Sequence, residues 1–236
     1  MMKIIVPIMA QTVQDAARQA AALAADPNAD WVELRLDPLP DAERLPALAA
    51  VRAALGGKTL LVTTRTAREG GLADLTPAAY AALCRAVLAA GGADLLDVEY
   101  SAGEPGRQLL AEAKAAGVRT VYSRHHFEGT PPLDEMVDTL TAMAGADIAK
   151  LAVMPRTAAD AALLLQATAL AGRKMPGTPL ITMSMGALGA VTRVCGGAFG
   201  SIATFGAAGV SSAPGQPDAA ALREALRSLE AAAPTR

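Results

Sequence analysis

Cysteine and histidine are scarce in this sequence. The two cysteines, Cys84 and Cys195, lie far apart and form no redox or metal-binding motif, so a reducing cytoplasm is the simplest setting. The two histidines, His125 and His126, are adjacent and have no ligand-like spacing to another histidine or cysteine. This pattern argues against a zinc site.

The sequence also lacks the features of a secreted, membrane or nucleic-acid-binding protein. The apolar stretch near the N-terminus is too short for the core of a signal peptide, and no cleavage pattern follows it. No apolar run reaches the ~18 residues that a membrane span needs. The formal net charge of -2 gives no basic field to attract nucleic acid. We therefore expect a cytoplasmic protein without membrane or nucleic-acid partners.

What the sequence does contain is a regular alternation of β-rich runs and alanine-rich segments, alanine being the best helix former. The segments predicted as strands are 3–9, 31–37, 59–66, 94–100, 119–125, 148–154, 179–185 and 201–207. The segments predicted as helices are about 12–25, 41–55, 76–91, 105–116, 132–144, 157–172, 186–196 and 217–232. Asp41, Thr76 and Thr157 are predicted as N-caps because their side chains accept hydrogen bonds from free helix N–H groups.

This alternation predicts an α/β protein of the (β/α)8 TIM-barrel class. Repeated strand–helix units give parallel strands joined by right-handed crossovers. Eight units in 236 residues favour closure into a barrel over an open sheet. No linker or low-complexity tract divides the chain. We therefore expect a single catalytic domain over residues 1–236.

Polar residues gather toward the ends of the predicted strands, where barrel active sites lie. Glu33 and Arg35 belong to the second predicted strand, and Asp97 and Glu99 to the fourth. Because side chains alternate along a strand, Glu33 and Arg35 share the face opposite their apolar neighbours and point into the barrel. Buried ion pairs are weak evidence for stability, so this convergence indicates a functional site. A structural Glu33–Arg35 pair is the alternative.

Lys150 is one of only five lysines and the only one inside an apolar strand, in the stretch DIAKLAVMP. Burial disfavours an ammonium group and frees an amine that can attack a carbonyl. Lys150 is therefore a candidate nucleophile, with the partner of a buried acid as the alternative.

Two further residues are candidates for chemistry or binding. His125 shares a strand face with Ser123 at the predicted catalytic mouth, which makes it a better general acid/base candidate than His126. Arg193 is either a rim charge or a clamp for a carboxylate, a group that matches its forked guanidinium. Met183 and Met185 are typical of a core as well as of a substrate wall.

The motifs taken together resemble the type I 3-dehydroquinate dehydratases of the shikimate pathway. The matching stretches run in the family's order from about residue 3 to residue 230, and each alone is a weak signal. They are VELRLD, TTRTAREGG, DLLDVEY, SRHHF, AKLAVMP, ITMSMGALGAVTRVCG, FGSIATFG and SSAPGQ.

The resemblance implies a role for each matching residue. Lys150 matches the Schiff-base lysine, His125 the general acid/base and Glu69 the carboxylate that orients this histidine. The residues implied in substrate binding are Glu33, Arg35 and Arg65 around the hydroxyls, Arg193, Ser212 and Gln216 at the ring carboxylate, and Met183, Met185 and Phe205 in an apolar wall. Asp97 and Glu99 match acids around the fourth strand. The resemblance implies no cofactor and no metal, and makes a homodimer reasonable.

Three departures from the family pattern are visible. His126 occupies the position after the catalytic histidine, where the family often has aspartate. Pro7 stands where some members have serine, and the segment between His125 and Lys150 is slightly short. None of these departures removes a catalytic group.

Two other function classes stay open. Class I aldolases and transaldolases also use a barrel lysine, but they usually act on phosphorylated sugars, whereas Arg193, Ser212 and Gln216 suit a carboxylate better. A non-catalytic carboxylate sensor or structural protein is the third alternative, against which the intact Lys150, His125 and Glu69 argue. For the dehydratase, both a biosynthetic role and a role in quinate breakdown are compatible with the sequence.

Overall fold

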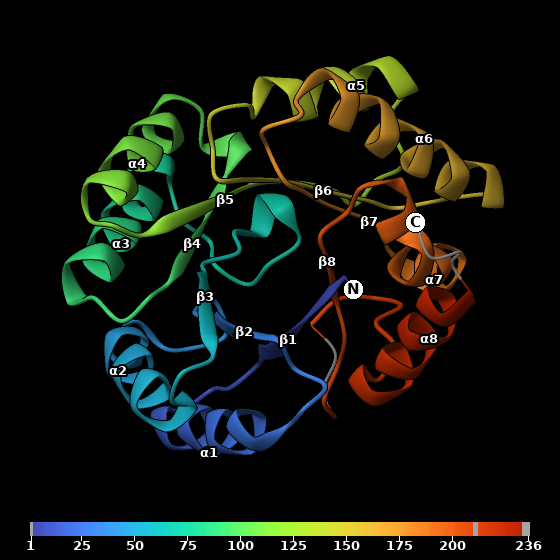
Figure 1. The fold of residues 1–236 in the computed structure, drawn as a ribbon. Helices are drawn as coiled ribbons and strands as arrows, with labels where there is room; N and C mark the ends of the chain where they lie inside the picture. The colour runs from blue at the N-terminus through green and yellow to red at the C-terminus, as the bar shows by residue number, and fades with distance from the viewer. Residues whose placement is uncertain (1, 210–211, 233–236) are drawn as a thin grey trace. The chain divides into compact units, whose positions relative to one another are not determined.

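The computed structural model describes residues 2–209 and 212–232. In this part of the chain, eight β-strands alternate with eight α-helices, as the sequence predicts (Figure 1). The strands belong to one sheet in the order β7-β6-β5-β4-β3-β2-β1-β8. By its internal contacts the chain divides into two compact units, residues 7–124 and residues 1–6 with 125–236.

The unit of residues 7–124 is a run of strand–helix repeats in which neighbouring strands are parallel. Its elements are α1 (Val13–Ala25), β2 (Trp31–Arg35), α2 (Arg44–Leu55), β3 (Thr59–Thr63), α3 (Pro77–Ala90), β4 (Leu95–Glu99), α4 (Glu104–Ala115) and most of β5 (Arg119–His126). β2 pairs with β3 along its whole length, and β4 pairs with β5 as far as Glu99 opposite Ser123. Helices α1 and α2 lie side by side, as do α3 and α4 (Figure 1).

The second unit contains the remaining repeats. Its elements are the first part of β1 (Lys3–Ile8), α5 (Leu133–Ala142), β6 (Ile148–Val153), α6 (Ala158–Lys174), β7 (Leu180–Ser184), α7 (Gly186–Cys195), β8 (Ala203–Phe205) and α8 (Ala219–Ala232). β6 pairs with β7 in parallel, and β1 pairs in parallel with β8, so the first strand of the chain joins the last. Helix α5 packs beside α6 (Figure 1).

Strand β2 is buried on both faces. Val32, Leu34 and Leu36 are fully buried, as their apolar character predicts, and the intervening Glu33 and Arg35 are buried as well. Because the charged face of β2 is buried as well as the apolar face, its charges need polar partners. These partners form the site described below.

Two of the three predicted helix caps are confirmed. The Thr76 side chain accepts a hydrogen bond from the N–H of Ala79 at the start of α3. Thr157 and Asp160 form a reciprocal capping box at the start of α6, in which each side chain accepts from the other residue's backbone N–H.

The predicted cap at Asp41 is wrong. Asp41 begins a short 3-10 helix, Asp41–Glu43, and α2 starts only at Arg44. The Asp41 carboxylate lies 2.8 Å from the Arg44 guanidinium. The Asp41 carboxylate therefore pairs with Arg44 instead of accepting a hydrogen bond from a helix N–H group, as the sequence pattern predicted.

Seven of the eight strands are shorter than predicted, and β3 and β8 are shortened most. β3 ends at Thr63 instead of residue 66, and β8 covers only Ala203–Phe205. Beyond β3 the chain leaves the ladder because the backbone N–H of Thr66 donates to the Glu99 side chain (2.8 Å) rather than to a neighbouring strand. The departure places Arg65 and the 3-10 helix Ala67–Glu69 at the end of the strand.

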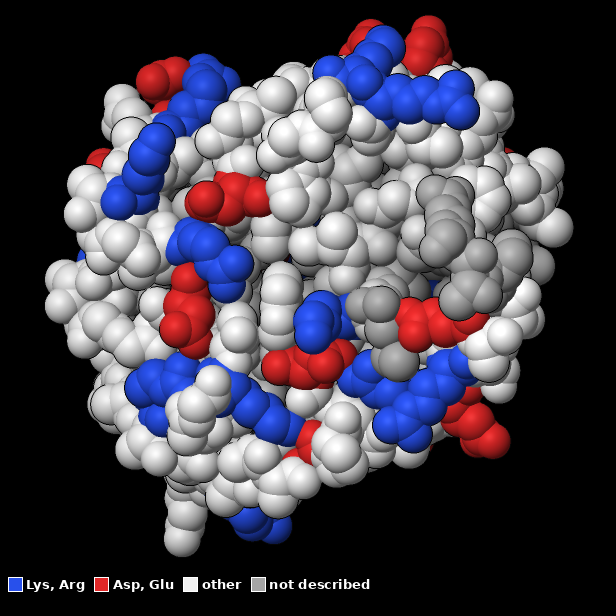
Figure 2. All heavy atoms as spheres, viewed as in Figure 1, with Lys and Arg blue, Asp and Glu red and all other residues white. Residues whose placement is uncertain are grey.

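The surface carries charges of both signs. On the face drawn in Figure 2, basic and acidic side chains are interspersed, in keeping with the near-balanced composition. None of the described helices combines the length and apolar character that crossing a bilayer requires.

Candidate active site

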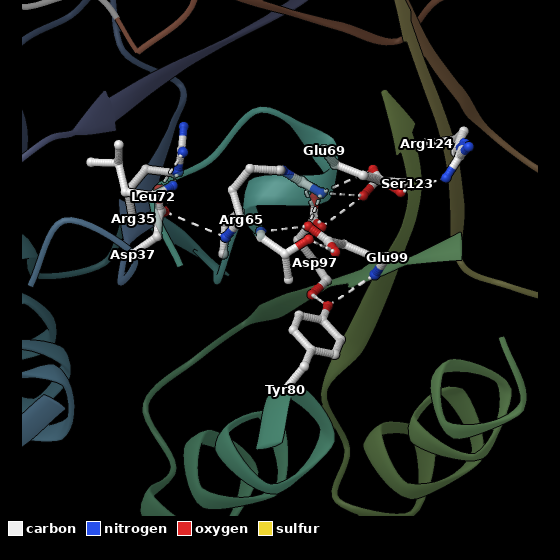
Figure 3. Close-up of polar contacts among 12 residues, drawn as sticks. Arg35, Asp37, Arg65, Glu69, Leu72, Tyr80, Asp97, Glu99, Ser123 and Arg124 are labelled. Carbon is white, nitrogen blue, oxygen red and sulfur yellow. Dashed lines mark hydrogen bonds and ion pairs between the residues drawn. The ribbon is translucent and has the colours of Figure 1, made fainter. Parts of the chain in front are cut away.

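Arg65 is the centre of a buried polar cluster in the unit of residues 7–124 (Figure 3). Its Nη2 donates to Asp97 (2.8 Å), and its Nη1 donates to Glu99 (2.9 Å) and Ser123 (3.2 Å). A longer contact of 3.4 Å joins Nη1 to Glu69. One guanidinium therefore ties together groups from the ends of β3, β4 and β5.

The charges of this cluster hold one another in place. Burial by itself lowers the pKa of Arg65, but Asp97, Glu99 and Glu69 together raise it above its ordinary value. Burial raises the pKa of Glu99, and the Arg65 cation opposes that rise. Glu99 also accepts two hydrogen bonds from Thr66, one from the backbone N–H and one from the hydroxyl (2.6 Å). Arg65 is thus a permanently charged side chain whose two terminal nitrogens are both hydrogen-bonded within the cluster.

Glu69 is held between two arginines. It is fully buried at the end of the 3-10 helix, where one carboxylate oxygen faces Arg65 and the other accepts from Arg124 at 3.2 Å (Figure 3). Arg124 is about one-third exposed and immediately precedes His125 in β5. The predicted role of Glu69 toward His125 stays a prediction.

Glu33 and Arg35 are buried as predicted, but they do not form the ion pair that was the structural alternative. Arg35 binds Asp37 with two parallel hydrogen bonds of 2.7 Å, and Glu33 accepts from the Thr63 hydroxyl at 2.8 Å. Side chains two residues apart lie on the same face of a strand, so the Arg35 side chain can reach Asp37. Glu33 instead pairs across to β3.

Lys150 lies in the second unit, in the middle of β6, and is 4% exposed. Its Nζ sits 4.5 Å from the centre of the Phe205 ring, from β8. Its neighbours in β6, Leu151 and Ala152, are buried. Lys150 therefore lies within a buried strand, as predicted, and the aromatic face offers a surface suited to a cation; its role as nucleophile stays a prediction.

Arg193 is buried in the same unit at the end of α7 and is 1% exposed. Its donors reach only the Met183 sulfur (3.5 Å) and the Pro214 carbonyl (3.3 Å), and among the described residues its Nε has no hydrogen-bond partner. Burial lowers the pKa of Arg193 to about 10. Arg193 is therefore a buried, desolvated cation rather than a rim charge, and its predicted role as an anion clamp stays a prediction.

The second unit also contains the remaining predicted residues of the carboxylate and apolar side, together with His125. Met183, Met185 and Phe205 are buried. The backbone N–H of Ser212 donates to the Gln216 side-chain carbonyl (2.8 Å), and the Gln216 amide donates back to the Ser212 hydroxyl (3.0 Å). This reciprocal contact closes a short loop after β8. His125 lies partly exposed in β5, two residues beyond Ser123.

Several residues of the cluster were not predicted as site residues. They are Asp37, Thr66, Tyr80, Ser123 and Arg124. Asp37 and Ser123 had a signal in the sequence, because strand alternation places them on the same faces as Arg35 and His125. Tyr80 comes from a helix, and no periodicity in the sequence links it to the strand ends. Among the described residues, no group of histidine, cysteine and acidic side chains is arranged to hold a metal ion.

Comparison with known proteins gives consistent results. Residues 4–233 match the sequence model of a protein family, which is described as type I 3-dehydroquinase. A 3-dehydroquinate dehydratase from Klebsiella pneumoniae subsp. pneumoniae is 41% identical over 94% of this chain and 91% of its own length. One from Lactiplantibacillus plantarum is 42% identical over 97% of this chain and 92% of its own length.

Solved structures resemble this fold over nearly its whole length. The 3-dehydroquinate dehydratase of Geobacillus kaustophilus superimposes with a TM-score of 0.94 at 34% identity, covering 99% of this chain and 93% of that one. The type I enzyme of Clostridium difficile, solved with covalently modified comenic acid, gives a TM-score of 0.92 at 34% identity, covering 98% and 93%. The predicted (β/α)8-barrel class is confirmed, and the chain belongs to the type I 3-dehydroquinase family.

Proposed function

We propose that this protein converts 3-dehydroquinate to 3-dehydroshikimate and water through an imine on Lys150. The observation that carries the proposal is the burial of this lysine in an apolar strand, next to an aromatic ring, in a chain of the type I 3-dehydroquinase family. A ring face that accommodates an ammonium ion also suits the iminium cation that forms at the same nitrogen.

The reaction begins at the C3 ketone. The Lys150 amine attacks the carbonyl carbon to give a carbinolamine, and loss of water from it gives the iminium. His125 moves the protons in these steps. The positive C=N bond then makes the hydrogen on C2 acidic, because the electrons of the C–H bond can move into it. Covalent catalysis of this kind replaces one difficult elimination by several easier steps.

His125 next removes the C2 hydrogen and leaves an enamine. The enamine expels the C1 hydroxyl, to which His125 returns the proton, so that water departs on the same face in a syn elimination. Hydrolysis of the remaining imine consumes the water lost in its formation and releases the product. A positioned acid/base of this kind contributes about 10²–10⁴-fold to the rate. Glu69 orients His125 in this scheme.

Arg193 holds the ring carboxylate of the substrate. Its cation is buried, and within residues 2–209 and 212–232 its Nε has no hydrogen-bond partner, so an anion is the natural partner. Two parallel N–H···O bonds fix both the position and the plane of a carboxylate. Ser212 and Gln216 close the loop over this group, and Met183, Met185 and Phe205 line the apolar side of the ring. Fixing the ring in this way contributes to the rate through orientation.

Glu33, Arg35 and Arg65 face the hydroxyl side of the substrate in this proposal. Each of the three is held by a hydrogen bond to another side chain: Arg35 to Asp37, Glu33 to Thr63 and Arg65 to Asp97. We further propose that the chain acts in the cytoplasm as one catalytic domain, in a homodimer, and without a cofactor.

Borohydride trapping tests the imine. The protein is incubated with 3-dehydroquinate, reduced with borohydride and digested, and the adduct is located by mass spectrometry. We expect a stable adduct on the peptide that contains Lys150, and none in Lys150→Ala, which folds but has no measurable turnover. Lys174→Ala is the matched control, because this lysine is exposed on α6.

Two results would contradict the proposal in different ways. Dehydration without any adduct would leave the activity standing but remove Lys150 as nucleophile. Adducts with phosphorylated sugars and no dehydration of 3-dehydroquinate would favour an aldolase.

A further inference from the structure

Strand β4 leaves its partner β3 before it ends. The β3–β4 pairing covers Leu61 and Val62 opposite Leu95 and Leu96, and within the described chain it does not continue to Asp97. The pairing of β4 with β5 on its other edge continues to Glu99. On this edge the last residues of β4 therefore have no register partner within the described residues of β3, although they are fully buried.

The hydroxyl of Tyr80 occupies this gap. Tyr80 is fully buried on α3, and its ring points from the helix to the end of β4 (Figure 3). The backbone N–H of Glu99 donates to the Tyr80 oxygen at 2.9 Å, and the hydroxyl donates to the backbone carbonyl of Asp97 at 3.3 Å. One phenol thus provides the acceptor and the donor that a neighbouring strand would provide.

The backbone segment that Tyr80 holds carries two carboxylates of the cluster. The Asp97 side chain accepts from Arg65 and from Ser123 (2.7 Å), and the Glu99 side chain accepts from Arg65 and Thr66. A shift of this segment moves both carboxylates, and with them the guanidinium of Arg65. Burial raises the pKa of the Tyr80 phenol well above its ordinary value, so the hydroxyl keeps the proton that it donates.

We propose that Tyr80 is a positioning residue for the dehydration: it fixes the Asp97–Glu99 end of β4 and thereby the placement of Arg65. The inference rests on the proposed function, since it assigns Arg65 to the substrate pocket. Tyr80 does not touch the substrate in this proposal and acts only through the cluster.

The test is Tyr80→Phe, which removes one oxygen and keeps the ring. We expect kcat/KM for 3-dehydroquinate to fall about tenfold per folded molecule, a modest share of the ~10²-fold cost of a 1 Å misplacement. Borohydride trapping on Lys150 persists in this variant, because the nucleophile lies in another part of the chain. Tyr122→Phe is the matched control: Tyr122 is also buried, its ring lies 5.2 Å from that of Tyr100, and we expect wild-type kinetics.

A double-mutant cycle separates positioning from a general structural role. If Tyr80 acts through Arg65, then Tyr80→Phe costs less than twofold in kcat/KM when Arg65→Lys is already present, since coupled residues are not additive. A full tenfold loss in that background, or unchanged kcat/KM in the single variant, would overturn the inference. A wild-type protein without dehydratase activity would instead refute the proposed function.

Amide hydrogen exchange provides a second measurement if Tyr80→Phe does not fold. In the wild-type protein we expect the Glu99 amide to exchange only with global unfolding, as a hydrogen-bonded core amide does. Rapid exchange of this amide, at the rate of loop amides, would show that the Tyr80 bond does not hold the strand end and would overturn the inference.

Discussion

Replacement of Arg193 by methionine is expected to make the protein more stable and less active. Arg193 is a buried cation; among the described residues it donates only to the Met183 sulfur and the Pro214 carbonyl, and no carboxylate pairs with it. Burial lowers the pKa of Arg193 to about 10. That decrease corresponds to a cost on the order of 3 kcal/mol for holding the charge in the fold.

The two effects of Arg193→Met have separate magnitudes. Removing a cost of about 3 kcal/mol, at about 2–4 °C per kcal/mol for a chain of this size, gives an upper bound of about 6–12 °C on the rise in Tm. The variant also loses the contacts of Arg193 with Met183 and Pro214, which offsets part of this rise in Tm. A hydrogen bond to a charged group contributes about 1.5–3 kcal/mol, so losing two to the substrate carboxylate lowers kcat/KM by at least ~100-fold.

Thermal unfolding and steady-state kinetics on the same preparation measure both effects. Arg44→Met is the matched control, because Arg44 is also buried but has partners of its own: its Nε donates to the Leu36 and Leu39 carbonyls (3.2 and 3.3 Å), and its Nη1 forms an ion pair with Asp41. Its loss lowers Tm and leaves kcat/KM per folded molecule unchanged. A lower Tm or near-wild-type kcat/KM in Arg193→Met would refute the anion-clamp reasoning.

Two further predictions concern the loop after β3 and the capping box of α6. Gly71→Ala places a Cβ 2.1 Å from the Arg65 carbonyl oxygen, so we expect the free energy of unfolding to fall by about 1–3 kcal/mol and kcat/KM to decrease. Gly57→Ala is the control, because nothing lies within 4 Å of a Cβ at that position. Equal Tm values for the two variants would contradict the prediction. Hydrogen bonds from the backbone N–H groups of Arg156 and Thr157 lower the pKa of Asp160, so its contribution to stability is complete above the ordinary aspartate value of about 4 and is lost as the pH falls through the lowered value. Asp160→Asn is therefore less stable than the wild type at pH 7, and unfolding in urea across the pH range should show the difference closing in acid; a difference that stays constant with pH would exclude this carboxylate as its source.

Local patterns in the sequence determined the secondary structure and the main candidates for chemistry. Strand and helix periodicities are properties of neighbouring residues, so eight strands and eight helices are readable without the fold. The caps at Thr76 and Thr157 depend on residues three positions apart and were equally readable. Lys150 stood out because a charged residue in an apolar strand is costly without a purpose.

Only the tertiary structure decided which side chains contact one another. Asp41 was misread as a cap because its ion pair with Arg44 competes with the helix N–H groups. Arg35 binds Asp37 rather than Glu33, and three partners of Arg65, namely Asp97, Glu99 and Ser123, come from β4 and β5, about 30–60 residues along the chain. Tyr80 reaches the cluster from a helix, where no spacing rule connects it to a strand end. Sequence periodicity specifies the face on which a side chain lies, but hydrogen-bond partners are set by how strands and helices meet in space, which depends on the packing of the whole chain.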